Sequence, residues 1–516
     1  MALAEKQLTV LFNHSFQRLT RTGNKITSVT VLDKANSTPV VISPKVVIDA
    51  TELGDVMATA KVPYDLGMEA GSKTGEKVGI QQSYNIIQDL TYVAILKDYG
   101  KGADCTIVKP KNYNPAEFDA ACTDYYIDKS RKAPGVNAQR MLDYGRLPNN
   151  KYMLNWPIYG NDIYLNLVEL NETQRIRELE KAKEQTYRFI YFIQQQLGFK
   201  HLGLADDEFP TPDRLALMPY HREGRRVKGL VRFTMRHIAE PFTYGDPLYR
   251  TGISVGDYPI DHHHKKNLAA PQHLEFYPVP SFNVPLGALI PQQVENLIIA
   301  EKGISVSNVA NGTTRLQPCV LLTGQAAGAL AGLSIQGMQR PSAVPVRLVQ
   351  QTILSAKAYL MPYYDVKPLH PHFEAIQKIG ATGILRGTGI PYKWANQTWF
   401  YPDSIVDAKA LLLGLNAYKK GNYRIKGHTL TIDAAIGVVA EMAKCLQKQL
   451  KKEKLALIEK DKARAFVAQN WAAWGLQDYR TDRMITRAEM AVLLNNTVDP
   501  FLLQPIDHNG NLMKVK

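Results

Sequence analysis

In the first fifty residues, apolar residues either alternate with polar ones or form unbroken runs. Both patterns predict strands. Three stretches, at 7–13, 25–32 and 39–42, are rich in Val, Thr, Leu and Ile and are separated by turn residues. The next stretch, 45–51, is apolar on both faces before it ends in Asp-Ala-Thr. An unbroken apolar strand suits a parallel sheet that is covered on both sides. The pattern therefore predicts the beginning of an α/β layer.

Two long helices are predicted in the middle of the chain. Asn171 can cap a helix over 172–197, and Gly198 can end it. A second helix, over 319–336, is apolar and contains small residues throughout, which allow close approach to a sheet or a ligand. A short buried strand at 296–300 precedes it.

The last third of the chain has a different pattern. Prolines punctuate residues 356–371, and short helical segments follow. Two of these segments, 400–412 and 479–494, repeat an aromatic residue, a turn and an amphipathic helix. We therefore predict a separate small helical domain over 365–510.

Composition narrows the class of protein. The chain has 516 residues, of which 45% are hydrophobic and 21% charged, as in a globular protein of several domains. The net charge is +14, but Lys and Arg are spread along the chain, so nucleic-acid binding is not predicted. No apolar run approaches the roughly 18 residues needed to span a bilayer, so no membrane span is expected. The first residues do not resemble a signal peptide, and the compartment stays open, with the periplasm or the exterior as alternatives.

The four cysteines give little indication of a site. None belongs to a CxxC pair, which argues against a zinc knuckle or a dithiol redox centre. A disulfide between Cys105 and Cys122 and unpaired buried thiols are both compatible with the sequence.

Five segments in a fixed order resemble the FAD-dependent oxidoreductase family that includes many bacterial proteins labelled "xanthan lyase-like". They are 47–55 with 62–67, then 221–226, 255–264, 284–291 with 295–302, and 304–310 through 314–318 into 324–328. The resemblance implies an α/β fold, with a doubly wound FAD-binding domain into which an α+β substrate domain is inserted. The implied boundaries are a partial FAD-binding domain at 1–70, the insertion at 71–285, and a return to the FAD-binding domain at 286–355.

The resemblance also implies FAD as the cofactor. The strand that ends in Asp-Ala-Thr would reach the sheet edge where nucleotides bind. A helix N-terminus aimed at the flavin would stabilise negative charge on the reduced ring. The cofactor-binding residues implied are Ala50, Thr51, Arg315, Gln317, Gly324 and Gln325. The alternatives are a plain buried strand and a tight helix–sheet contact made by the glycines.

One feature of the family is not found in the sequence. Relatives begin with a strand, a GxGxxG turn and a helix, which place the diphosphate on backbone amides. No GxGxxG motif occurs in this chain, and we expect roughly a hundred residues to be missing upstream by comparison with a complete doubly wound domain. The alternative function is therefore a non-catalytic remnant or a cell-surface binding protein that no longer holds FAD.

Candidate catalytic residues come from the inserted region. Arg222 and Arg226 can clamp an anionic or polyhydroxyl substrate, with Glu223 orienting them. His262 and His264 belong to a run of three histidines that can supply a general base. The alternatives are a surface salt-bridge cluster and a solvated polar loop. The run lacks the helical spacing of metal ligands, so no metal is predicted.

The expected substrate is a small polar molecule, with a carbohydrate as one candidate. Trp156 and Tyr159 can stack on sugar rings, although core packing is an equal alternative. The tail resembles S-layer homology modules at 383–387, 400–403 and 485–489. That resemblance implies contact with cell-wall polymers or another protein, and the alternative is a helical cap on the enzyme.

Overall fold

The N-terminal strands form an antiparallel sheet. The computed structural model describes residues 2–514, and its first sheet has the order β1 (His14–Thr22), β2 (Lys25–Asp33) and β3 (Thr38–Ile42). The second and third predicted strands are confirmed. The strand predicted at 7–13 is wrong, because β2 ends at Asp33 opposite His14 and leaves those residues no partner.

A pair of parallel strands joins distant parts of the chain. β4 (Val47–Asp49) lies beside β15 (Leu297–Ile299), and the Asn296 side chain bonds the backbone N–H and carbonyl of Ile26 at 2.8 and 2.9 Å. All of β15 is buried, as predicted. β4 is less covered than its apolar pattern predicts, because Ile48 is 40% exposed on the edge strand. No other strand within residues 2–514 joins this sheet.

The region after residue 71 has a core of its own. It contains a four-stranded sheet in the order β11-β7-β9-β8, a two-stranded ribbon of β6 and β10, and a long helix, α4. The bounds are β6 (Leu90–Thr91), β7 (Ala94–Asp98), α3 (Ala138–Tyr144), β8 (Arg146–Leu147), β9 (Lys151–Leu154), β10 (Asp162–Ile163), α4 (Glu172–Gln195) and β11 (Leu202–Leu204). The predicted helix is confirmed: Asn171 caps it, it ends two residues early, and Gly198 turns the chain with φ 80°.

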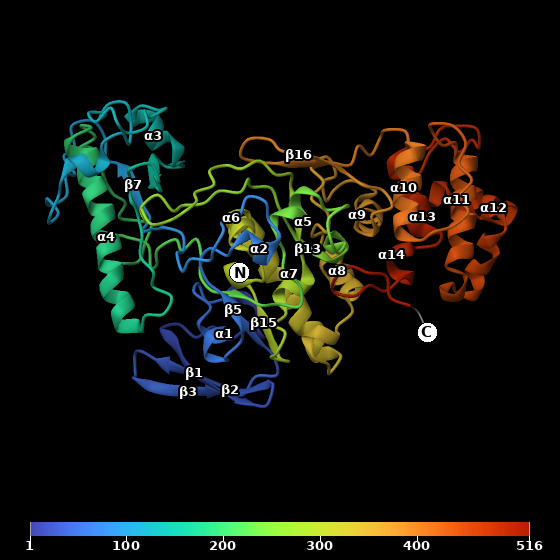
Figure 1. The fold of residues 1–516 in the computed structure, drawn as a ribbon, viewed down its shortest axis with the longest axis horizontal. Coiled ribbons are helices and arrows are strands. Elements are labelled where there is room, and N and C mark those ends of the chain that lie inside the picture. The colour runs from blue at the N-terminus through green and yellow to red at the C-terminus, as the bar shows by residue number, and fades with distance from the viewer. Residues whose placement is uncertain (1, 515–516) are drawn as a thin grey trace.

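The central region joins the two ends of the molecule. Its elements are α1 (Asp55–Thr59), β5 (Tyr64–Asp65), α2 (Gly71–Thr74), β12 (Arg226–Val227), α5 (Met235–Ala239), β13 (Gly252–Gly256), β14 (Phe282–Pro285), α6 (Asn308–Thr314), α7 (Gln317–Gln336) and α8 (Val346–Ser355). Figure 1 shows α4 and its sheet at one end, the C-terminal helices at the other, and these elements between them.

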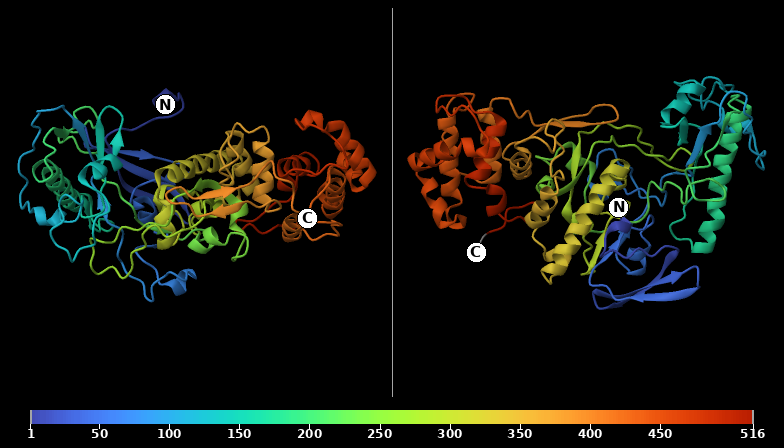
Figure 2. Two further views of the ribbon diagram at one scale, coloured as in Figure 1. Left: turned by 90° about the horizontal axis from the view of Figure 1, so that it is seen from above. Right: turned by 180° about the vertical axis from the view of Figure 1, so that it is seen from behind.

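Helix α7 crosses the middle of the molecule, drawn in yellow in Figure 2. By length and composition this 20-residue helix could span a membrane, so the expectation that no stretch reaches that length is wrong. α7 instead packs against β13, α8 and both parallel strands, with buried residues along one side. Its role here is that of a core helix with one open face.

The C-terminal region is mostly helical, as predicted. Its elements are α9 (Phe373–Thr382), β16 (Thr388–Ile390), β17 (Gln397–Trp399), α10 (Ala408–Tyr418), α11 (Ile432–Cys445), α12 (Lys460–Asn470), α13 (Arg487–Asn496) and α14 (Pro500–Leu503). The two repeated segments touch through a bridge between Ile405 and Thr486. One apolar core runs from Val231 to Ile506 and continues through the proline-rich segment.

The four cysteines are free thiols. Cys122 and Cys319 are buried, and Cys105 and Cys445 are half-buried. The disulfide alternative for Cys105 and Cys122 is therefore wrong in this structure.

Candidate functional site

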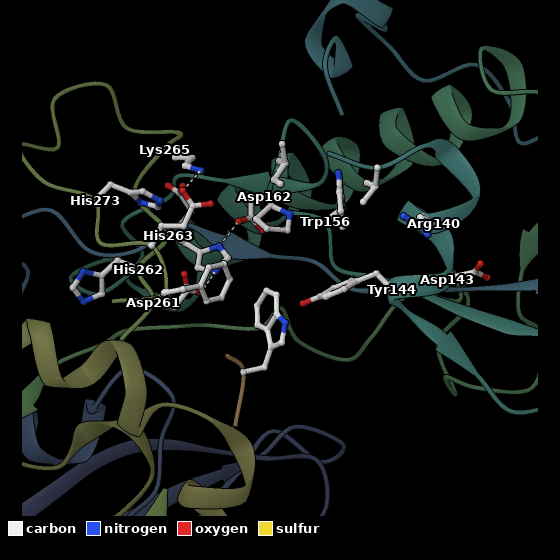
Figure 3. Close-up of a pocket in the computed structure, with 17 residues that line it drawn as sticks. Arg140, Asp143, Tyr144, Trp156, Asp162, Asp261, His262, His263, Lys265 and His273 are labelled. Atoms are coloured by element: carbon white, nitrogen blue, oxygen red, sulfur yellow. Dashed lines mark hydrogen bonds and ion pairs between the residues drawn. The ribbon is translucent and has the colours of Figure 1, made fainter. Parts of the chain in front are cut away.

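A cavity of about 580 Å³ is lined mainly by residues of segment 136–162 and of the loop after β13. Figure 3 shows polar side chains at one side of this cavity and Tyr144 and Arg140 at the other. A space of this size, walled by aromatic and apolar side chains with a few convergent polar groups, is typical of a small-molecule site. The side chains that line the cavity include Asp89, Tyr144, Trp156, Asp162, Asp261, His262, His263, Phe276 and Trp394.

His263 is held between two carboxylates in the cavity wall. Its Nδ1 lies 2.8 Å from Asp162 Oδ2, and its Nε2 lies 3.1 Å from Asp261 Oδ2 (Figure 3). Asp162 begins β10, whereas Asp261 and His263 belong to the loop after β13, so two distant segments build the arrangement. Carboxylates on both nitrogens fix the orientation of the ring.

Two buried arginines support these carboxylates. Arg222 Nη2 lies 3.2 Å from Asp162 Oδ1, and Arg315 Nη2 lies 3.4 Å from Asp261 Oδ2. Burial opposes ionisation, but Arg222 and His263 outweigh it and hold the pKa of Asp162 below its usual range. Burial likewise opposes ionisation of Asp261, and contacts with His263 and Arg315 hold its pKa low. Both carboxylates are therefore charged at neutral pH.

The predicted arginine cluster is internal. Arg222 is 1% exposed and reaches the cavity wall through Asp162, while its Nη1 donates to the Asp89 carbonyl at 2.8 Å. Arg226 instead pairs with Glu223 and, at 2.7 Å, with Glu69. The alternative of a surface salt-bridge cluster is wrong. The structure brings Arg222 to the site and leaves Arg226 and Glu223 in the interior beside it.

The histidine run has its outer members turned inward. His262 Nε2 lies 3.0 Å from the Asn308 carbonyl, and neither ring nitrogen of His264 has a hydrogen-bond partner within residues 2–514. Burial lowers the pKa of His262 to about 4 and that of His264 to about 2, so both rings are neutral at pH 7. His262 still borders the cavity, whereas His263, which the sequence did not single out, presents its ring to it.

Asp89 is a second residue that sequence reasoning missed. It borders the cavity, its Oδ2 accepts from the Lys266 N–H at 3.0 Å, and its Oδ1 is buried with no partner among residues 2–514. Burial raises the pKa of Asp89 to about 7, and the nearby Asp162 adds to the shift. A lone Asp before a two-residue strand carries no sequence signal of this environment.

The predicted sugar-stacking residues differ in position. Trp156 borders the cavity and donates from Nε1 to the Ala121 carbonyl at 3.0 Å. Tyr159 lies under the Arg131 guanidinium, 4.7 Å from the ring centroid, and is not among the residues that line the cavity. Tyr144 also lines the cavity, and its ring packs edge-on against that of Trp156 with the centroids 5.6 Å apart.

The end of β4 forms a tight polar turn. The Asp49 carboxylate accepts from the Thr51 N–H and hydroxyl and from the Met57 N–H, at 2.6–2.9 Å. Ala50 is exposed and Thr51 half-buried at this end of the strand. Ligands of parallel sheets bind at the carboxyl ends of the strands, so both residues lie at the edge of the sheet where a nucleotide is expected.

An ion cluster follows β15 at the same edge. Lys302 Nζ lies 2.8 Å from Glu52 Oε2 and 2.6 Å from Glu301 Oε2, and Lys302 is almost fully buried. Glu301 has φ 58°, in the left-handed region that favours glycine. The edge thus carries one buried cation and two carboxylates.

Helix α7 presents an open face beside these turns. Gln317, Gly324 and Gln325 are exposed, and a Cβ on Gly324 would meet no atom within 4 Å. The alternative that this glycine serves a tight helix–sheet contact is wrong. Arg315, just before α7, is buried and bonds the Tyr220 hydroxyl at 3.1 Å.

These groups fit an anionic, planar ligand at the start of α7. No side chain caps α7, so its first N–H groups are free of side-chain partners, and Arg315 Nε is buried without one among residues 2–514. Uncapped N–H groups and a guanidinium favour negative charge, and the open glycine face accepts a flat ring.

Comparison with known proteins assigns most of the chain to a family. A family model described as "FAD dependent oxidoreductase" matches residues 1–353. No curated protein and no solved structure gives a match.

Proposed function

The chain belongs to the FAD dependent oxidoreductase family, whose cofactor is FAD, and on that premise we propose that it oxidises or reduces a small polar substrate in the cavity beside His263. The observation that carries the proposal is the His263 ring held between Asp162 and Asp261 in that wall. We propose a carbohydrate of pyranoside type as the substrate class, because aromatic side chains and hydrogen-bonding groups line the same space.

The residues proposed to hold the cofactor are those that lie at the strand ends and at α7. Ala50 and Thr51 would contact the adenosine half, and Gln317, Gly324 and Gln325 would lie against the flavin half, with Arg315 behind them. When bound, FAD supplies an acceptor or donor of a hydride equivalent. Lys302 offers a positive charge at the same edge. A bound FAD would compete for this charge with Glu52 and Glu301, which pair with it in the structure.

The chain's own groups would manage the proton. In the oxidation direction, the substrate hydroxyl would replace Asp261 at His263 Nε2, the longer of the two contacts at 3.1 Å, and would pass its proton to that nitrogen. Asp162 would hold the other nitrogen and stabilise the ring once it is protonated. Arg222 and Arg315 would keep both carboxylates charged throughout. His262 and His264 would stay neutral and shape the loop.

The test is anaerobic reduction of the FAD-loaded chain. A panel of methyl pyranosides and sugar acids is mixed with it, and the loss of flavin absorbance is followed. We expect reduction by at least one compound, and a rate about 10²–10⁴ lower in His263→Ala. His428→Ala, at an exposed position of the C-terminal region, is the control and should react as the unaltered chain does. Equal rates in His263→Ala and the control would remove His263 from the reaction.

Cofactor binding has a test of its own. Because the sequence has no GxGxxG turn, we expect FAD to be held by fewer backbone amides and to be lost during gel filtration. In a titration followed by flavin fluorescence, Gly324→Val should weaken binding at least tenfold, because its side chain would occupy the open face. Gly332→Val, also at an open position of α7, is the matched control. Stoichiometric flavin after gel filtration, or equal affinities for the two variants, would contradict this arrangement.

A further inference from the structure

A hairpin of the C-terminal region extends over the centre of the molecule (Figure 1). It is formed by β16 and β17, which pair antiparallel with Gly389 opposite Thr398, and its tip comprises residues 391–396. This hairpin lies outside residues 1–353, which define the oxidoreductase family in this chain. Its position therefore needs a reason other than the family fold.

The base of the hairpin is fixed to the central region. Thr398 Oγ1 lies 2.7 Å from Ser281 Oγ in a buried contact, and the Tyr364 N–H donates to the Thr398 carbonyl at 2.8 Å. A Cβ on Gly389 would come within 2.6 Å of Pro280 Cβ, so this close approach requires glycine. These contacts determine where the tip lies.

The tip carries an indole to the cavity that holds His263. Trp394 borders the cavity of about 580 Å³ together with Phe276, and their rings meet edge-on with centroids 4.2 Å apart. Trp394 nevertheless remains 56% exposed, and Phe276 37%. Large aromatic surface left open beside a small-molecule cavity is stabilised when a ligand covers it.

The other side of the tip is loosely packed. A neighbouring recess of about 310 Å³ is bordered by Tyr392, Trp394 and Phe276. Tyr392 is 50% exposed and borders this recess but not the cavity beside His263, whereas Trp394 borders both spaces. The two aromatic residues of one tip thus differ in their access to the site, which makes Tyr392 a matched control.

We propose that the β16–β17 hairpin completes the substrate site, and that Trp394, with Phe276, forms an aromatic wall that stacks on the ring of a pyranoside. The inference rests on the proposed function, because the site is the one assigned there to the substrate. It gives the C-terminal region a direct part in substrate choice. The Asp261 and His263 side chains on the same cavity supply partners for ring hydroxyls.

The experiment measures binding without turnover. Methyl β-D-glucopyranoside and methyl β-D-glucuronide are titrated into the full chain without FAD, and saturation transfer from protein to sugar-ring protons is followed by NMR. We expect binding to the unaltered chain, a Kd raised about tenfold in Trp394→Ala, and no change in Tyr392→Ala. Trp394→Phe should recover most of the affinity, since it keeps an aromatic face.

The outcomes separate the two proposals. Sugar binding that depends on Trp394, without flavin reduction by any sugar, supports the wall and removes the proposed oxidoreductase substrate. Reduction by a sugar with equal Kd in Trp394→Ala and Tyr392→Ala overturns the wall and leaves the proposed function. Absence of binding of both glycosides to the unaltered chain also overturns the wall.

Discussion

At the scale of single residues, the interior contains ion pairs between buried side chains. Arg226 is fully buried and is shared between Glu223 and Glu69. Removing one partner of such a group leaves an uncompensated buried charge, which costs more than the pair itself contributes. Loss of Arg226 should therefore destabilise the fold around Glu223 and Glu69.

We expect Arg226→Met to lower the free energy of unfolding by about 3–5 kcal/mol, because both carboxylates lose their cation. The control is Lys181→Met, which removes the partner of Glu178 in a surface pair at 2.7 Å and should cost less than about 1 kcal/mol. Urea unfolding followed by tryptophan fluorescence measures both. A loss of equal size in the two variants would show that Arg226 acts as a surface charge does.

Asp89 links stability to pH. Burial raises its pKa from 3.8 to about 7, so between these values the folded chain binds a proton that the unfolded chain has released. The stability that this carboxyl contributes is complete below pH 4 and is lost as the pH rises through 7. Asp162, Arg222 and Lys266 are the charged groups that face it.

We expect Asp89→Asn to remove this dependence. Relative to the unaltered chain, the variant should gain about 2–3 kcal/mol of unfolding free energy between pH 5 and pH 8. Urea unfolding at the two pH values gives the difference directly. Stability curves that stay parallel would mean that Asp89 is charged at pH 5 in the folded chain.

The site could be predicted from the sequence only in part. The His262–His264 run lies in a loop that lines the cavity, and Arg222 and Arg315 both contact carboxylates of its polar wall. The sequence could not tell which histidine faces the cavity, because that depends on how the loop crosses α6 and β10. Asp162 and Trp394 come from segments far from the run, and their contributions depend on tertiary packing alone.

At the scale of elements, local signals determine boundaries where a cap is present. Helix α4 begins with a capping box, in which Asn171 Oδ1 accepts from the Gln174 N–H at 2.9 Å and Gln174 Oε1 accepts from the Asn171 N–H at 3.0 Å. The sequence predicted this start correctly. It failed at 7–13, where strand propensity is present but a partner strand is not.

We expect Asn171→Ala to cost about 1 kcal/mol of stability, because the Gln174 N–H in the first turn loses its side-chain acceptor. Asn171→Asp keeps an acceptor at the same position and should cost only a fraction of that. Hydrogen exchange over residues 172–176 reports the effect locally. Unchanged protection in Asn171→Ala would place the stability of this turn in its tertiary contacts.

At the scale of the whole molecule, the C-terminal region shares its core with the central region. Arg250 Nε donates to the Thr382 carbonyl at 3.1 Å, and Asn283 Nδ2 donates to the Leu360 carbonyl at 2.8 Å, all in buried positions. The predicted domain boundary at 356–371 therefore crosses a continuous apolar core. Separating the two sides would leave polar and apolar groups without partners.

We expect a chain that ends at Ser355 to lose its fixed tertiary packing. Near-ultraviolet circular dichroism should weaken while helical signal persists, and the chain should bind 8-anilinonaphthalene-1-sulfonate. The full chain is the control. A cooperative unfolding transition of the shortened chain would instead show that residues 1–355 fold without the C-terminal region.

The hydrogen bond between Asn296 and Ile26 can form only late in translation, because the two residues are 270 positions apart. At about 5–20 residues per second, the ribosome needs about 15–50 s after Ile26 to make its partner. During that interval β2 and β4 exist without the segment that will cover them, and unpaired strand edges associate with one another. We therefore expect added chaperone during synthesis to raise the yield of folded chain.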